Sequence, residues 1–238
     1  MGNAVRGDFG ESWHYGIPVT EKFNQVVWYS FIINIITFLV QLLISIPLGI
    51  IAARKQYSRA DYAITIFALA GISLPTFFLA TILKYVFSIQ LGWFDLYGLT
   101  GRYHSSMTSF QQVLDIAYHM VLPIVTLMML SIGGLMRYTR TNMLEVLNSD
   151  YIRTARAKGL SEKVVINKHA FRNTLIPLVS YMSFLLPSMF GGAQITETLY
   201  QIPGIGYISY QAMIRGDIPF AMFYTTFLIL LTQISLLI

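Results

Sequence analysis

The chain is dominated by long runs without a charged side chain, which are separated by shorter polar segments. Crossing the hydrocarbon core of a bilayer takes about 20 apolar residues in a helix. Five runs free of Asp, Glu, Lys and Arg come close to or exceed that length: Tyr29–Ala53, Tyr62–Leu83, Ile116–Met136, Asn173–Thr196 and Ile218–Ile238. The pattern predicts an all-α, polytopic transmembrane helix bundle with five spans.

A sixth uncharged stretch, Thr198–Ile214, carries Gln201, Pro203 and Gly204. These residues interrupt regular helices, so we expect a structured loop or a re-entrant segment there. Five prolines lie within or at the ends of the spans, where neighbouring helices can satisfy the carbonyls that proline frees. We expect kinks, some of them hinges, at Pro47, Pro75, Pro123, Pro177 and Pro187.

Composition supports a membrane protein and removes several kinds of chemistry. Of the 238 residues, 55% are apolar and only 11% are charged, against about a quarter charged in soluble domains. Cysteine is absent, which excludes disulfides and thiolate sites from the sequence. The chain also contains no phosphate-binding GxxxxGK[ST] loop and no HExxH spacing. We therefore expect a transport subunit without catalytic residues, cofactor or bound metal, and not an enzyme.

Basic residues predict the orientation of the spans. Segments 54–61 and 137–172 hold eleven of the sixteen Lys and Arg residues, and such segments stay in the cytoplasm. The outer segments are then 1–28, 84–115 and 197–217. The domain organisation is an extracytoplasmic segment, 1–28, followed by a transmembrane domain, 29–238, of a prokaryotic cytoplasmic (inner) membrane protein.

This orientation sends the first span from outside to inside, although Met1–Gly10 has no apolar core of a signal peptide. The last run also stops at Ile238 with no flanking charge. We therefore expect a further N-terminal span and a C-terminal tail beyond the sequence given. Spontaneous translocation of a short N-terminal tail is the alternative.

The span cores contain no Asp or Glu. Ion-coupled carriers usually need such groups near the middle of the membrane, so the energy for transport is expected to come from another subunit. Polar residues within the spans either line a neutral path or bond across helices. The candidates for the path are Asn34, Gln41, Ser73, Thr76, Ser183 and Gln194.

The cytoplasmic segment 137–172 carries the most specific pattern. Asn148, Ser149 and Asp150 can cap a helix, which is predicted over Tyr151–Lys158. Gly159 suits the left-handed position that ends such a helix, and a second helix is expected from Ser161. Physical chemistry alone leaves two interpretations open: a helix lying on anionic lipid, or a docking element for another protein.

The stretch SDYIRTARAKGLSEKVVINKHAFRNTLIPL resembles the EAA loop of binding-protein-dependent ABC transporter permeases, and more narrowly the dipeptide/oligopeptide branch. Arg153 stands where the general pattern has Glu, and the distance from Gly159 to Pro177 is longer than in the general loop, as in this branch. GDFGESWHYGIPVTE at 7–21, LGWF at 91–94 and ETLYQIPGIGYISYQAMIRGDIPFAM at 197–222 resemble other parts of the same family, in the right order.

The resemblance implies the fold of a type I ABC importer permease that forms half of a translocation pathway. It implies as partners a second homologous permease, cytoplasmic ABC ATPase subunits, an extracytoplasmic substrate-binding protein and the lipid bilayer, with no nucleic acid. A coupling helix would dock on the ATPase through Asp150, Tyr151, Arg153, Thr154, Ala155, Arg156, Ala157, Lys158, Gly159 and Leu160. Ala155 and Ala157 are expected to allow close approach.

The resemblance favours di- or oligopeptides as substrates. Nickel chelates and oligosaccharides are the alternatives within the same family. A secondary carrier and a membrane scaffold that transports nothing are the alternatives outside it.

Overall fold

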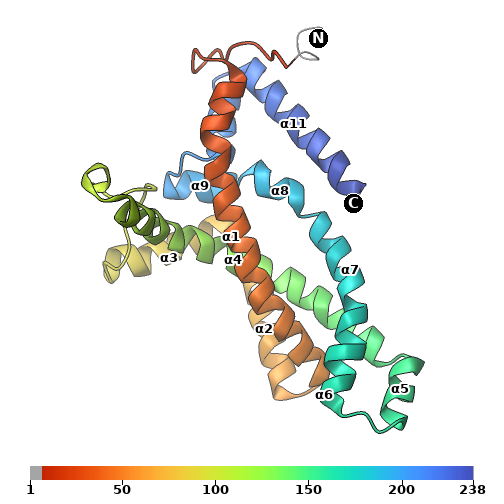
Figure 1. Cartoon of the computed structure of the whole chain (residues 1–238). Helices are drawn as coiled ribbons and strands as arrows, with labels where there is room; N and C mark the ends of the chain where they lie inside the picture. The colour runs from red at the N-terminus through yellow and green to blue at the C-terminus, as the bar shows by residue number, and fades with distance from the viewer. Residues whose placement is uncertain (1–6, 238) are drawn as a thin grey trace. The chain divides into compact units, whose positions relative to one another are not determined.

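The computed structural model describes residues 7–237, and nearly all of its regular structure is helical. The elements in chain order are α1 (Val19–Arg54), α2 (Arg59–Ser73), α3 (Thr76–Leu83), η2 (Lys84–Gln90), η3 (His104–Ser106), α4 (Ser109–Leu147), α5 (Asp150–Ala157), α6 (Glu162–Val164), η4 (Val165–Ala170), α7 (Phe171–Ser183), α8 (Leu186–Gly191), α9 (Gln194–Tyr200), α10 (Ile205–Ile214) and α11 (Ile218–Leu236). Segments η2 and η4 are π-helices, and η3 is a single 3₁₀ turn. Figure 1 shows the order of the elements along the chain.

The chain divides into two compact units. The first unit comprises Met1–Thr37, Thr76–Leu127 and Leu185–Ile238, and the second comprises Phe38–Pro75 and Met128–Phe184. Each unit has an apolar cluster of its own, so each is described by itself.

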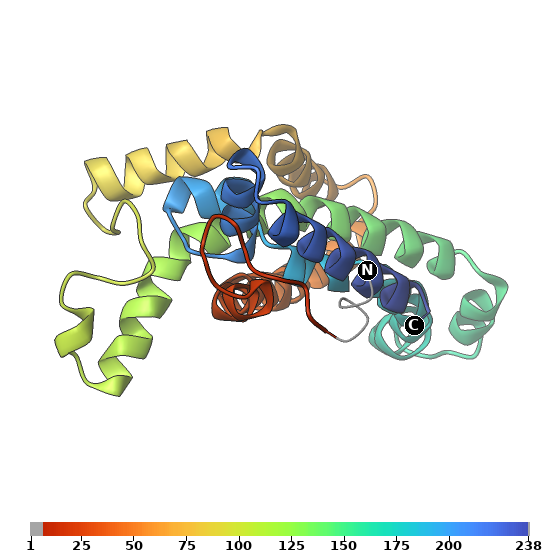
Figure 2. The ribbon, with the colours of Figure 1, turned by 90° about the horizontal axis from the view of Figure 1, so that it is seen from above.

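The core of the first unit joins the N-terminal segment to the last two helices. Val19 and Phe220 are completely buried in it, and Ile205 and Ala212 of α10 pack beside them. The rings of Phe9 and Phe23 meet the ring of Phe223 edge-on, with centroids 4.6 and 5.1 Å apart. Segments from opposite ends of the chain therefore share one core, as the view from above shows (Figure 2).

In the second unit, glycines bring helices into close contact. A methyl group added to Gly71 of α2 would lie 2.4 Å from the carbonyl oxygen of Met129, and one added to Gly133 of α4 would lie 2.5 Å from that of Ala68. These distances allow no side chain, so α2 and α4 pack backbone to backbone. Small residues commonly mediate such packing in membranes.

Within residues 7–237, four helices are long and apolar enough to cross a membrane, or five if α2 and the α3–η2 segment count as one broken span. The four are Val19–Arg54, Ser109–Leu147, Glu162–Gly191 and Ile218–Leu236. This number agrees with the prediction of an all-α bundle with five spans. Several helices are longer than the uncharged runs that predicted them, for example α1 and α4. Charged residues can continue a helix beyond the hydrocarbon.

Two predicted spans are not continuous helices. The run Tyr62–Leu83 breaks at Leu74, which is extended at φ −86° and ψ 130°, because the residue before a proline disfavours the helical region. The run Asn173–Thr196 breaks at Gly192, whose φ is +72°. Conversely, the stretch Thr198–Ile214, expected to be a loop or re-entrant, ends in the regular helix α10.

Candidate functional site

The short helix α5 begins at Asp150 and ends at Ala157, within one residue of the predicted limits. Ser149 occupies the N-cap position, but its hydroxyl makes no cap bond and donates instead to the carbonyl of Val146 at 2.6 Å. Of the three candidate caps, Asn148, Ser149 and Asp150, it is Ser149 that holds the N-cap position, but its hydroxyl satisfies the end of the preceding helix instead.

The C-terminal end of α5 follows the prediction. Gly159 has φ +76°, the left-handed region that Gly adopts without strain. Its N–H donates to Arg156 O at 2.9 Å, and the N–H of Leu160 donates to Ala155 O at 3.4 Å. This pair of bonds is the Schellman arrangement, which satisfies the last carbonyls of a helix. Gly159 thus fixes the turn that leads to α6.

One face of α5 packs against other elements of the second unit, to which α5 itself belongs. Ile152 is fully buried and Ala155 is 7% exposed. They belong to a cluster with Ala53, Met143, Val165, Ile166 and Ala170, and Figure 1 shows α5 beside α6. Burying an isoleucine side chain contributes roughly 1.5–3 kcal/mol, so this contact fastens the short helix to α4 and η4.

The remaining residues of the predicted docking segment are exposed: Asp150, Tyr151, Arg153, Thr154, Arg156, Ala157, Lys158, Gly159 and Leu160. Arg156 is held by Glu162, with the guanidinium nitrogens 2.8 and 3.2 Å from the carboxylate oxygens. That hydrogen bond raises the pKa of Arg156, and burial lowers it less. The structure differs from expectation at Ala155, which approaches the core of its own chain and not the outer surface.

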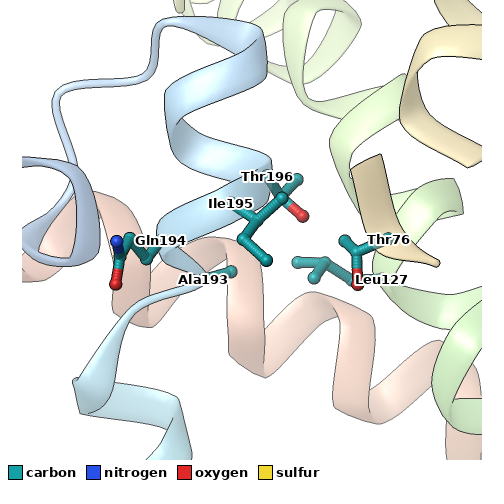
Figure 3. A pocket seen from close by; sticks show the side chains of 6 residues that line it. All are labelled: Thr76, Leu127, Ala193, Gln194, Ile195 and Thr196. Carbon is teal, nitrogen blue, oxygen red and sulfur yellow. The ribbon is translucent and has the colours of Figure 1, made fainter. Parts of the chain in front are cut away.

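The candidate path residues separate into two groups. Thr76 and Gln194 line one pocket of about 280 Å³ together with Leu127, Ala193, Ile195 and Thr196. Thr196 is 1% exposed, and its hydroxyl has no hydrogen-bond partner among the described residues. Figure 3 shows that this hydroxyl points toward Thr76 and Leu127, whereas the amide of Gln194 points away from them.

The other four candidates bond to backbone carbonyls. Asn34 donates to Ser188 O and Met189 O at 3.3 and 3.2 Å, and Gln41 donates to Ser131 O at 3.1 Å. The hydroxyls of Ser73 and Ser183 donate to carbonyls of their own helices. These bonds support the structural interpretation, that such residues hold segments together.

The outer segment 197–217 is built around a carboxylate that the sequence did not single out. Glu197 is 1% exposed. It accepts bonds from the hydroxyl of Ser30 at 2.7 Å and from the N–H groups of Ala193 and Tyr207, both at 2.9 Å. Gly204 packs so closely that an added methyl group would lie 2.5 Å from this carboxylate. One acidic side chain thus joins α1, α9 and the start of α10.

A second carboxylate, Asp217, caps α11 and receives the N-terminal segment. It accepts bonds from the N–H groups of Trp13, His14 and Phe220 at 3.2, 3.1 and 3.3 Å, and from the hydroxyl of Ser12. Burial raises the pKa of Asp217, but these four hydrogen bonds outweigh burial and hold the pKa below its ordinary value. Within residues 7–237, no three His, Asp or Glu side chains gather closely enough to hold a metal ion.

Comparison with known proteins decides the family. Residues 45–238 match the model of the binding-protein-dependent transport system inner membrane component. The chain belongs to this family. It is a multi-pass permease of the prokaryotic cytoplasmic membrane and a transport component, as the sequence predicts.

Among its relatives, the oligopeptide transport system permease protein of Bacillus subtilis is 38% identical, over 94% of this chain and 70% of the relative. The dipeptide transport system permease protein of Alkalihalophilus pseudofirmus is 34% identical, over 92% of this chain and 70% of the relative. The chain is also similar in fold to a chain of the inward-facing MetNI methionine ABC transporter, with a TM-score of 0.68 at 16% identity, over 91% of this chain and 92% of that one.

Proposed function

We propose that the chain is a permease subunit of an ATP-driven importer of di- and oligopeptides, forms half of the translocation pathway, and couples to a cytoplasmic ATPase through α5. The observation that carries the proposal is the two-sided character of α5. Ile152 and Ala155 fasten it to the core, while Arg153, Thr154 and its other side chains face outward. Family membership adds the kind of machine in which such a helix has a use.

A small buried face makes α5 suitable for transmitting movement. The Ile152 and Ala155 side chains pack with Met143 of α4 and with Val165 of η4, and η4 continues directly into α7. A force on the outer face of α5 would therefore reach two spans through packed side chains. Close-packed interiors move as bodies and deform little, so closure of an ATPase dimer would shift these spans together.

The remaining partners follow from the same proposal. A second, homologous permease completes the pathway, two ATPase subunits hydrolyse ATP, and an extracytoplasmic binding protein delivers the substrate at the outer segments. The pocket lined by Thr76 and Gln194 is one part of this chain that we assign to the pathway. Its lining has no charge, which suits passage of substrates of varied charge.

Peptides are the proposed substrates because relatives 38% and 34% identical to this chain are named for oligopeptides and dipeptides. Nickel chelates and oligosaccharides remain the alternatives. Uptake of a radiolabelled tripeptide, a nickel chelate and an oligosaccharide by cells that carry the complete transport system separates the three. Peptide uptake alone is the expected result, and uptake of either other substrate in place of peptide would replace this assignment.

The coupling role is tested by reversing charge on the exposed face of α5. Arg153→Glu with Thr154→Trp alters two exposed residues and leaves the buried Ile152 untouched. We expect the ATPase to be lost when the variant is purified from detergent-solubilised membranes, and peptide uptake to be lost with it.

The matched control is Arg59→Glu, a reversal of charge at an exposed residue of α2 in the other basic segment. The control should retain the ATPase. Normal co-purification with the α5 variant, with both chains present at wild-type levels in the membrane, would contradict the coupling role.

A further inference from the structure

A second pocket, of about 430 Å³, lies within the second unit on α4 and α7. Five of its lining residues recur at intervals of three and four along α4, so they share one face of that helix. They are Gly134, Arg137, Tyr138, Thr141 and Asn142, and Tyr181 of α7 completes the lining. The volume lies within the range of small-molecule sites.

Arg137 gives this pocket a positive charge without a partner. It is the first charged residue after the uncharged run Ile116–Met136, and it is exposed. Arg140, Arg153 and Arg156 each contact a carboxylate. Arg137 forms no ion pair or hydrogen bond with any residue in 7–237. Because no acidic residue lines the pocket, its charge favours an anion.

The rest of the lining offers flat apolar walls and neutral hydrogen-bonding groups. The rings of Tyr138 and Tyr181 stack, with their centroids 4.7 Å apart and an angle of 25° between their planes. Asn142 donates its amide N–H to the carbonyl of Tyr138 at 2.8 Å, which leaves its side-chain carbonyl able to accept. Thr141 supplies an exposed hydroxyl. An occupant would combine a negative group, an N–H donor and an apolar part.

We propose that this pocket binds the carboxyl-terminal end of a transported peptide on its way into the cytoplasm. This inference rests on the proposed function. The guanidinium of Arg137 takes the terminal carboxylate in its planar fork. The Asn142 carbonyl accepts the last peptide N–H, and the tyrosine rings contact the last side chain. A lipid phosphate diester would satisfy the charge but offers no N–H to Asn142.

The test compares a tripeptide that has a free carboxylate with the same tripeptide ending in an amide, in cells carrying the complete transport system. For each peptide, uptake by the Arg137→Gln variant is divided by uptake by the unaltered chain. Because every strain has the same binding protein, its own preference cancels in this ratio. We expect a fall of about tenfold or more for the free acid, the loss of one charge-assisted hydrogen bond, and less than a twofold change for the amide.

Two further variants distinguish recognition of the peptide carboxylate by Arg137 from a general loss of transport caused by altering a cytoplasmic charge. Arg137→Lys keeps the charge but loses the fork, so it should retain more free-acid uptake than Arg137→Gln. Arg172→Gln removes an exposed cytoplasmic charge outside the pocket and should change neither ratio. All variants are compared at equal amounts in the membrane.

Several outcomes would overturn the proposal. An equal fall for both peptides would show that Arg137 does not recognise the carboxylate. An effect that varies in proteoliposomes with anionic lipid content, and not with the carboxylate, would make the pocket a headgroup site. If the unaltered chain with its partners imports no peptide at all, the proposed function fails first. Peptide import that is insensitive to Arg137→Gln removes only this inference.

Discussion

Carboxylates are satisfied in different ways in the two units. In the first unit, Glu197 accepts three hydrogen bonds and Asp217 accepts four, all from neutral N–H and O–H groups. In the second unit, Asp61 forms a two-bond pair with Arg140, with both N–O distances 2.8 Å, and Glu162 pairs with Arg156. These carboxylates therefore bind neutral hydrogen-bond donors in one unit and arginine side chains in the other.

The supply of cations explains the difference. Eleven of the sixteen basic residues lie in segments 54–61 and 137–172, both within the second unit, and the positive-inside rule predicts that these two segments are cytoplasmic. In the first unit, Asp115 contacts His104 and His119, whereas Glu197 and Asp217 have no Lys or Arg partner among the described residues and bond to backbone N–H groups and hydroxyls. Such an acid fixes the path of its loop, whereas a paired acid joins one side chain to another.

The largest effect is expected from Glu197→Ala. It leaves three donors without their acceptor in a site that is 1% exposed, and each unsatisfied buried group costs about 1–3 kcal/mol. We expect a loss of about 3–5 kcal/mol in the free energy of unfolding, measured by thermal unfolding of the purified permease in detergent. Glu145→Ala, at an exposed site on α4, is the matched control. Equal unfolding temperatures for the two variants would show that Glu197 does not organise the outer segment.

The Asp61–Arg140 pair should rank second. Its side chains are 5% and 25% exposed, so it is less fully enclosed than Glu197. Arg140→Gln leaves the Asp61 carboxylate without its cation, for which we expect a loss of about 2 kcal/mol, below the range for fully buried pairs. A double-mutant cycle with Asp61→Asn measures the coupling. If Arg140→Gln lowered the free energy of unfolding as much as Glu197→Ala does, the predicted order of the two carboxylates would be wrong.

Asp217 should add a pH dependence. Because its pKa is lower in the folded chain, its contribution is complete above the unfolded pKa, about 3.9, and is lost as the pH falls through the folded value. We expect the unfolding temperature to decline more steeply below about pH 4 for the wild type than for Asp217→Asn. Thermal unfolding between pH 3 and 7 checks this. Parallel curves for the two chains would refute the role of this carboxylate.

The smallest effect is expected at Arg156–Glu162. Both side chains are about half exposed, at 43% and 48%, and exposed pairs contribute roughly 0–1 kcal/mol. Glu162→Gln should change the unfolding temperature by less than 1 °C, which thermal unfolding at low and at 0.5 M salt can establish. A large fall in unfolding temperature that depends on salt would show that the Arg156–Glu162 pair stabilises the chain about as much as the Asp61–Arg140 pair.

The helices were predictable because lipid-crossing segments need long apolar runs, and the limits of α5 were predictable because Gly159 ends the helix by a local rule. A kink at Pro75 was predicted, and the helix breaks beside it at Leu74. The break at Gly192 was not predicted, since hydropathy does not register backbone angles. The Gly191–Gly192 pair was the available signal.

Orientation of side chains was harder to predict than helix position. Ala155 and Ala157 are equally small, so size does not distinguish them. Ala155 follows the buried Ile152 by three residues and therefore lies on the same face of the helix, toward the core, whereas Ala157 does not. The burial of Glu197 could not be predicted from its position, because acidic residues are common beside a predicted span. Gly204 and Gly206 were the signal in the sequence for this burial, since backbone can approach a buried carboxylate closely only where side chains are missing.

The π-helix η4 has a consequence for insertions and deletions. A π segment accommodates one more residue than the α-helix it interrupts, and η4 stands between α6 and α7. Removing one residue from Val165–Ala170 would let the backbone return to regular α-helix. Because the wider π turns hold the extra residue, the helix before and after it would stay in phase. Removing one residue from the regular helix α7 would instead turn everything before it by about 100° around the helix axis, so that α5 would present a different face. The π segment therefore lets this stretch lose one residue without redirecting the short helix.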